Sequence, residues 1–185
     1  MFSLIQSLDE SIQFFVQGHF HVPVLDTLLI FITKLGDSGF IWIVLGLLLV
    51  CFRKTRRCGI AVLLALLAEW AICNGLLKNL IARPRPYTLF PDIQLYVPKL
   101  HSYSFPSGHA ASSFVAATAF FLYYKRAGIA ALILAALIAF SRVYLFMHWT
   151  TDVLAGALFG SLIAVGVVKL LQALEKRHLT KPNQN

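Results

Sequence analysis

Long apolar stretches separated by short polar or basic segments dominate the chain. Because a helix needs about 20 mostly apolar residues to cross a bilayer, we expect spans at 58–77, 107–124, 127–147 and 149–172. Two shorter apolar stretches, 24–35 and 40–52, flank a turn at 36–39. The pattern predicts an all-α polytopic transmembrane bundle of five or six spans, depending on how residues 10–35 enter the membrane.

The first 20 residues have a different pattern, in which apolar positions recur at helical spacing. These positions are Phe2, Ile5, Leu8, Ile12 and Phe15. Residues 1–20 therefore form an amphipathic helix that lies in the membrane interface or leads into the first span. We expect no cleavable signal peptide, because this segment lacks a basic start and polar residues interrupt its apolar ones.

Composition supports the membrane assignment. Hydrophobic residues make up 58% of the 185 positions and charged residues 13%, compared with about 25% charged residues in an ordinary soluble domain. A soluble domain of this size could not bury so much apolar surface. We therefore expect one membrane-embedded domain over residues 1–185.

Charge indicates how the bundle is oriented. The formal charge is +8, and basic residues gather at 53–57, at 125–126 and in a tail at 173–185. Alternating spans place all three clusters on one side, which the positive-inside rule makes cytoplasmic. A polar, proline-containing loop at 82–104 and the turn at 147–149 then lie on the outer side. The sequence has no basic helix and no aromatic-basic platform, so we do not expect nucleic-acid binding.

Most of the remaining polar residues gather at the outer ends of four successive spans. They are Lys78, Arg85, Ser107, Gly108, His109, Arg142, His148 and Asp152. Antiparallel helices bring these ends to one face, so we expect a single pocket. Its three cations would repel one another unless a multiply charged anion bound between them, and guanidinium and ammonium groups suit phosphate oxygens. Ser107 can cap its helix and leave the amides of Gly108 and His109 facing the anion.

The histidines indicate what the pocket does to an anion. His148 and Asp152 are four residues apart and share one face of a helix. A carboxylate that accepts from one ring nitrogen leaves the other as a free nucleophile, and His109, on another helix, can protonate the leaving oxygen. The cysteines form no C-x-x-C pair, and no further ligands accompany His148 and Asp152, so neither zinc nor another cofactor is expected.

Three motifs carry a resemblance to a known family. They are K-x6-R-P at 78–86, P-S-G-H at 106–109 and S-R-x5-H-x3-D at 141–152. Together, over residues 78–152, they resemble the signature of the type 2 phosphatidic acid phosphatase (PAP2) family. The resemblance implies a metal-independent phosphatase that acts through a phosphohistidine. It makes His148 the nucleophile, Asp152 its orienting partner and His109 the general acid. It assigns binding of the phosphoryl oxygens to Lys78, Arg85, Ser107, Gly108 and Arg142.

The resemblance narrows the substrate to a lipid phosphate or diphosphate whose tail stays in the bilayer. Undecaprenyl diphosphate ranks first, because an outer site suits recycling of a carrier lipid. Phosphatidylglycerophosphate, phosphatidic acid and lipid A phosphates are alternatives. Two other classes stay open: a non-enzymatic lipid-phosphate binder, and a peroxidase that holds vanadate in the same anion site. No pattern indicates an oligomeric state.

Several residues near the motifs receive weaker expectations. Arg83 is not a signature position, and we expect a rim contact at best. Glu69 lies nine residues before Lys78, half a turn out of phase on a straight helix, and should face away from the site. Asn74, one turn before Lys78, should support that lysine. Four loop residues would touch a head group or nothing, namely Tyr87, Lys99, His101 and Tyr103. Gly156-x3-Gly160 should allow close helix packing.

Overall fold

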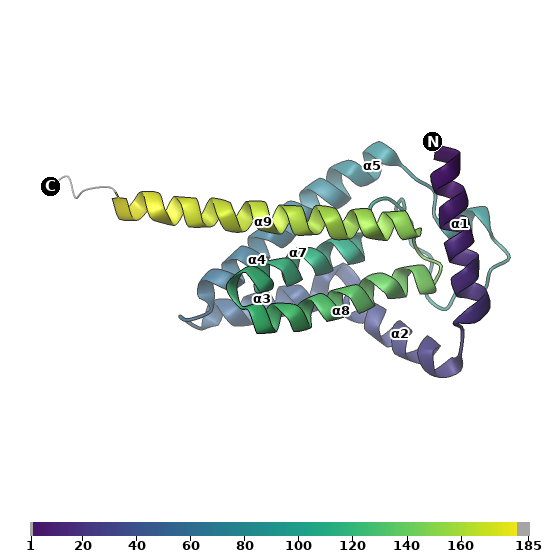
Figure 1. Cartoon of the computed structure of the whole chain (residues 1–185), viewed down its shortest axis with the longest axis horizontal. Coiled ribbons are helices and arrows are strands. Elements are labelled where there is room, and N and C mark those ends of the chain that lie inside the picture. The colour runs from purple at the N-terminus through teal and green to yellow at the C-terminus, as the bar shows by residue number, and fades with distance from the viewer. Residues whose placement is uncertain (1, 181–185) are drawn as a thin grey trace.

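The computed structural model describes residues 2–180, which are helical except for short turns and one long loop (Figure 1). The elements are α1 (Phe2–His19), α2 (Pro23–Leu35), η1 (Asp37–Gly39), α3 (Phe40–Cys51), α4 (Arg56–Glu69), η2 (Trp70–Leu77), α5 (Lys78–Ile81), α6 (Pro86–Leu89), α7 (Gly108–Tyr123), α8 (Lys125–Tyr144) and α9 (Thr150–Thr180). Element η2 is a π-helix that continues α4 into α5. The all-α prediction is confirmed. The predicted basic tail continues α9 as far as residue 180, and its last residues, 181–185, lie outside the described part.

Helix α7 forms the centre of the bundle and packs against α4, α8 and α9. Small residues make this close packing possible, and Ala110, Ala111 and Ala116 are fully buried on α7. A Cβ at Gly156 of α9 would lie 2.6 Å from the carbonyl oxygen of Ser107, and a Cβ at Gly160 would collide with the carbonyl oxygen of Ala111. The close packing predicted for the two glycines is therefore confirmed.

Three helices within residues 2–180 are long and apolar enough to cross a membrane by themselves. They are Arg56–Leu89, Lys125–Tyr144 and Thr150–Arg177. The segments Pro23–Leu35 and Asp37–Cys51 pass the same test as a pair bent by 45°. Helix α7, with 16 residues, is shorter than these. The count of five or six spans therefore stays a prediction.

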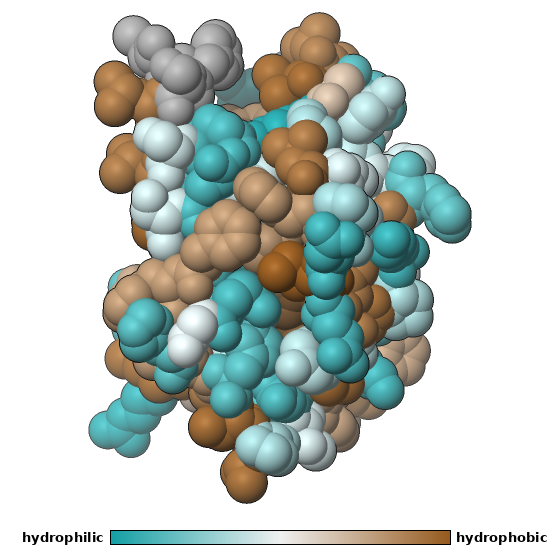
Figure 2. Space-filling view, turned by 90° about the vertical axis from the view of Figure 1, so that its right-hand side faces the viewer, coloured by the Kyte–Doolittle hydropathy of each residue, from teal (hydrophilic) through white to brown (hydrophobic). Residues whose placement is uncertain are grey.

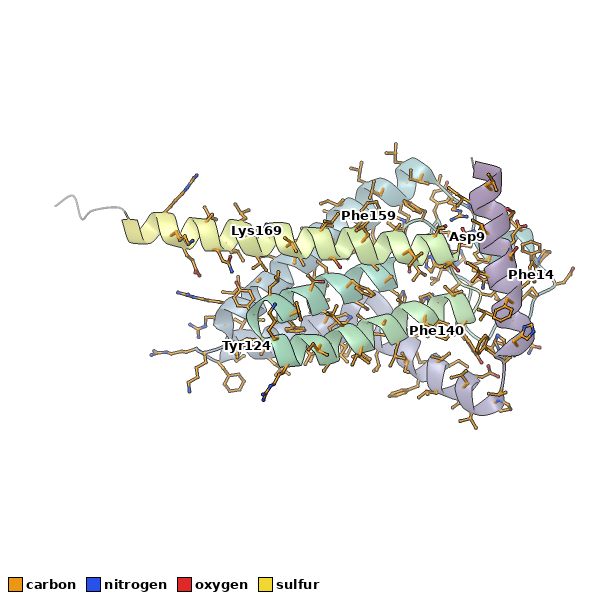
Figure 3. All side chains as sticks on the ribbon, in the orientation of Figure 1. Asp9, Phe14, Tyr124, Phe140, Phe159 and Lys169 are labelled. Carbon is orange, nitrogen blue, oxygen red and sulfur yellow. The ribbon has the colours of Figure 1, made fainter. Side chains whose placement is uncertain are left out.

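The predicted basic segments meet at one end of the bundle. The hydroxyl of Tyr124 donates to the carbonyl oxygen of Lys54 at 2.9 Å, which joins the α3–α4 and α7–α8 connections. Arg57 pairs with Glu175 on α9, with Nε and Oε1 3.2 Å apart. Tyr124 marks this end in Figure 3, and Asp9 marks the opposite end, where α1 lies. This arrangement agrees with the predicted placement of the basic loops on one side.

Helix α1 lies across the opposite end of the bundle, against α8 and α9 (Figure 1). Its buried face is polar: Asp9 and Gln13 are fully buried, and Gln13 Nε2 donates to the carbonyl oxygen of Val143 at 2.6 Å. The apolar face turns outward, with Leu8 60% and Phe15 55% exposed. Figure 2, which looks at this end, shows hydrophobic side chains among hydrophilic ones. Helix α1 is thus anchored by polar contacts and presents apolar side chains to its surroundings, which suits an interfacial helix.

Candidate active site

A cavity of about 650 Å³ opens at the α1 end of the bundle, between the predicted chemical residues and an apolar wall. Five of the eight predicted site residues line it, namely Lys78, Arg85, Gly108, His109 and His148. The apolar wall comes from α3, α4 and η2, and its members are Ile43, Leu63, Leu66, Leu67 and Trp70. The other three predicted residues, Ser107, Arg142 and Asp152, are buried beside these. The predicted convergence at one site is therefore present.

His148 lies in the loop between α8 and α9, two residues before α9 begins, so it does not share a helix with Asp152 as expected. Its side chain is 1% exposed, and its Nε2 lies 3.0 Å from Nη1 of Arg85, which donates to it. Burial lowers the pKa of His148 well below the ordinary value, and the charges of Arg85 and Arg142 lower it further. The imidazole is thus neutral, with its proton on Nδ1 and its lone pair on Nε2.

A serine lies between His148 and Asp152. Nδ1 of His148 is 3.8 Å from Oδ2 of Asp152, which is too long for the direct hydrogen bond that we expected. Ser104 Oγ donates to that Oδ2 at 2.5 Å and lies 3.4 Å from Nδ1. Ser104 is fully buried, although it comes from the polar loop, and no motif marks it.

Arg83 is the second side chain that donates to Asp152, and the expectation of a rim contact is wrong. Its Nη1 donates to Oδ1 of Asp152 at 2.7 Å, and its Nη2 donates to Oδ2 of Asp9 at 2.8 Å. Asp9 also accepts from the amide of Thr151 at 2.9 Å. Arg83 therefore joins Asp152 to the N-terminal helix. Polar residues recur every three or four positions along α1, and this polar face is the sequence signal from which a contact between α1 and the site could have been predicted.

The other two arginines are held differently. Arg85 donates from Nε to the carbonyl oxygen of Ser102 at 2.7 Å and from Nη2 to that of Tyr103 at 3.1 Å. The loop residues thus fix this arginine mainly through their backbone. Arg142, 2% exposed, donates from Nη1 to Thr33 Oγ1 at 2.6 Å. Its Nε has no hydrogen-bond partner within the described residues. A phosphoryl oxygen would supply the missing acceptor.

The start of α7 has the predicted cap. Ser107 Oγ accepts from the amide of Ala110 at 3.5 Å, and the Ser107 amide donates to the carbonyl oxygen of Asp152 at 3.0 Å. A Cβ on Gly108 would lie 2.8 Å from Oδ1 of Asn74, so a larger residue here would have to move the Asn74 side chain. His109 follows, and its Nε2 lies 2.9 Å from Oδ1 of Asp37, a residue to which sequence reasoning gave no role.

Glu69 faces the site, and the prediction that it faces away is wrong. Its side chain lines the cavity and is 2% exposed, and its Oε1 accepts from Nδ2 of Asn74 at 3.1 Å. The reason is the π-helix between Glu69 and Lys78, which takes more residues per turn than an α-helix and so changes the phase of the two side chains. Asn74 accordingly bonds to Glu69, where we expected it to support Lys78.

Within residues 2–180, no three His, Cys, Asp or Glu side chains are grouped so that they could hold a metal ion. The polar lining of the cavity includes two cations and two imidazoles, which suit an oxyanion, and the carboxyl group of Glu69.

The comparisons with known proteins agree with this donor set. The family model of the PAP2 superfamily matches residues 57–176. The chain belongs to the PAP2 superfamily. A relative named undecaprenyl-diphosphatase from Sulfolobus acidocaldarius is 35% identical over 144 residues, 77% of this chain and 69% of the relative. Phosphatidylglycerophosphatase B from Bacillus subtilis is 33% identical over 175 residues, 86% of this chain and 81% of the relative.

Solved PAP2 structures have the same fold. A transmembrane PAP2-type phosphatidylglycerolphosphate phosphatase from Bacillus subtilis superposes with a TM-score of 0.73 at 30% identity, covering 98% of this chain and 90% of the other. LpxE from Aquifex aeolicus gives a TM-score of 0.76 at 31% identity, covering 88% and 95%. The PAP2 motifs all lie inside the matched segment 57–176, whereas Asp9 and Asp37 lie before it.

Proposed function

We propose that this PAP2 protein is an integral-membrane lipid phosphatase that removes the terminal phosphoryl group of undecaprenyl diphosphate and releases undecaprenyl phosphate. The observation that carries the proposal is the two-sided cavity, with Arg85, Lys78 and His148 at one end and leucines of α4 at the other. One end suits a phosphoryl group and the other an apolar chain. The relative from Sulfolobus acidocaldarius with this activity in its name supports the choice of substrate.

The proposed reaction begins at His148. Its Nε2 lone pair attacks the terminal phosphorus, forming an N–P bond while the bond from phosphorus to the bridging oxygen breaks. His109 gives a proton to the departing oxygen, and the lipid monophosphate leaves. A water molecule, losing its proton to His109, then attacks the phosphohistidine and releases phosphate with a free His148. Lys78, Arg85 and Arg142 stabilise the charge that develops on the equatorial oxygens.

Before substrate binds, Nη1 of Arg85 donates to the attacking nitrogen itself, 3.0 Å away. A phosphoryl oxygen is a stronger acceptor than an imidazole. Its arrival therefore draws the guanidinium away and frees the lone pair beside the phosphorus. This exchange would couple phosphate binding to activation of the nucleophile.

The proposal includes the side of the membrane. The basic segments gather at the opposite end of the bundle from the cavity, and short basic loops favour the cytoplasm. The site then lies on the outer face, where the lipid tail stays in the bilayer against Ile43, Leu63 and Leu67. An outer site suits a carrier lipid that is released on that face.

The test is phosphate release by the purified protein in nanodiscs. Undecaprenyl diphosphate, phosphatidylglycerophosphate and phosphatidic acid are compared by kcat/KM, with and without EDTA, and His148→Ala is the control. The highest kcat/KM for undecaprenyl diphosphate, unaffected by EDTA and lost in the variant, supports the proposal. A higher kcat/KM for phosphatidylglycerophosphate would make that lipid the substrate, in agreement with the name of the 33% identical relative. Binding without turnover would make the protein a lipid-phosphate binder.

A further inference from the structure

We infer that Asp37 is the positioning residue of the proposed general acid His109, so that the site contains a second histidine–aspartate pair. The inference rests on the proposed function, because it needs His109 to protonate a leaving oxygen. Asp37 Oδ1 and His109 Nε2 are 2.9 Å apart, and the two residues are separated by 72 positions along the chain. Asp37 lies outside the segment matched by the family model.

The turn that carries Asp37 is built to approach His109. A Cβ on Gly36 would lie 3.0 Å from Cδ2 of His109 and 2.7 Å from Cγ2 of Ile138, so a larger residue would push against the imidazole and the isoleucine. After Asp37, Ser38 and Gly39 both have positive φ, 52° and 68°, and the chain bends by 45° between α2 and the segment Asp37–Cys51. The turn therefore places a carboxylate at the imidazole through its backbone shape.

The charges around His109 call for such a partner. Burial of the ring disfavours its protonated form most, and the charges of Arg142 and Lys78 disfavour it further. A general acid must carry a proton when substrate arrives. The carboxylate of Asp37 opposes the two cations and favours the imidazolium. Removing Asp37 would leave burial and the two cations unopposed, so a smaller fraction of His109 would carry a proton when substrate binds.

The contact also determines which nitrogen reacts. With Nε2–H donating to Asp37, the nitrogen left for the substrate is Nδ1. The Nδ1 proton passes to the leaving oxygen as the P–O bond breaks, and Nδ1 recovers a proton from the water that attacks the phosphohistidine. Asp37 stays ionised throughout. Its side chain is 62% exposed, while that of His109 is 13% exposed.

The experiment varies how much the leaving group needs an acid. Two substrates carry the same dodecyl chain: dodecyl phosphate, whose alkoxide must be protonated, and a dodecyl-substituted nitrophenyl phosphate, whose phenolate leaves without help. Asp37→Asn should lower kcat for the alkyl ester by about 10- to 100-fold, a part of the 10²- to 10⁴-fold that acid catalysis typically contributes. The aryl ester should change less than about threefold on the same reasoning.

The matched control is Asp26→Asn, which removes another aspartate–histidine contact, the 2.8 Å bond to His21, from α2. Any effect of Asp26→Asn should be equal for the two esters. His109→Ala should show the selective loss of the Asp37 variant, and the double variant should lose little more. Equal losses of Asp37→Asn on both esters, or an unchanged alkyl rate, would overturn the inference. If His109→Ala instead slows the alkyl and aryl esters equally, His109 is not the general acid, and that part of the proposed function is wrong.

Discussion

The two sides of the active site hold their histidines in contrasting ways. His148 is fully enclosed and is held by Arg85 on one ring nitrogen and by Ser104 near the other. His109 faces the cavity and bonds through one nitrogen to an aspartate that is largely exposed. A nucleophile must stay neutral and in place until phosphorus arrives, whereas an acid must lose and regain a proton in each cycle. The difference in burial suits these two proposed tasks.

The supports of the two histidines also come from different parts of the chain. Behind His148 lies a series of buried and half-buried contacts through Ser104, Asp152 and Arg83 to Asp9 on α1. Behind His109 lies one turn between α2 and α3. Several mutually bonded groups fix a side chain more firmly than a single bond does. Removing a support of the nucleophile should therefore slow alkyl and aryl esters alike, whereas removing Asp37 should mainly slow the alkyl ester.

The largest effect should come from His148→Ala. We expect a loss of about 10,000-fold or more in kcat, and equally for alkyl and aryl esters, because the N–P bond cannot form. Phosphate release by the purified variant measures it. If the variant turns over substrate at the wild-type rate, His148 is not the nucleophile, and the contrast between the two histidines does not hold.

Ser104→Ala should come next. The Asp152 carboxylate loses one donor and keeps those of Arg83 and the Trp149 amide, and Nδ1 of His148 loses the neighbouring hydroxyl. We therefore expect kcat to fall roughly 10- to 100-fold, the value of a hydrogen bond to a charged group. The control is Ser113→Ala, which removes another buried serine that accepts from Trp42 Nε1 at 3.0 Å. That variant should lower thermal stability with little change in kcat. Similar kcat values for Ser104→Ala and wild type would show that the serine only fills space.

Arg83→Lys tests whether α1 supports the nucleophile. Lysine keeps the charge but cannot donate to Asp152 and Asp9 in the same forked geometry, so we expect about a tenfold loss in kcat. Asp9→Asn should give a similar loss. Ser7→Ala, on the exposed part of the same helix, is the control, since its hydroxyl bonds only locally to Leu4. If kcat falls in Arg83→Lys but not in Asp9→Asn, the effect of Arg83 comes from its bond to Asp152 alone, and α1 does not support the nucleophile.

Much of this arrangement was predictable because its cause is local. Apolar length predicts helices, and the order of Lys78, His109 and His148 along antiparallel spans predicts that they converge. The contacts of Asp9, Asp37 and Ser104 were not predictable, because they join residues 74, 72 and 48 positions away in sequence. The orientation of Glu69 was predicted wrongly for another reason. The π-helix that turns its side chain toward the cavity has no recognisable pattern in the sequence.

Glu69→Gln should have the smallest effect. The amide keeps an oxygen that can accept from Asn74 but removes a negative charge from the cavity that holds Lys78. We expect KM for an anionic lipid to fall by up to about fivefold, the scale of a partly screened charge interaction, with kcat nearly constant. Steady-state kinetics in nanodiscs measures both. A large loss in kcat would instead give Glu69 a part in the chemical step.

The central claim is that phosphoryl transfer passes through His148, and single-turnover trapping tests it most directly. Enzyme is mixed with undecaprenyl diphosphate labelled on the terminal phosphate, quenched in base within milliseconds, and digested for peptide mapping. We predict a base-stable, acid-labile phosphoryl group on His148, absent from His148→Ala and longer-lived in His109→Ala. Label on another residue, or no labelled enzyme while turnover proceeds at its normal rate, would contradict the account.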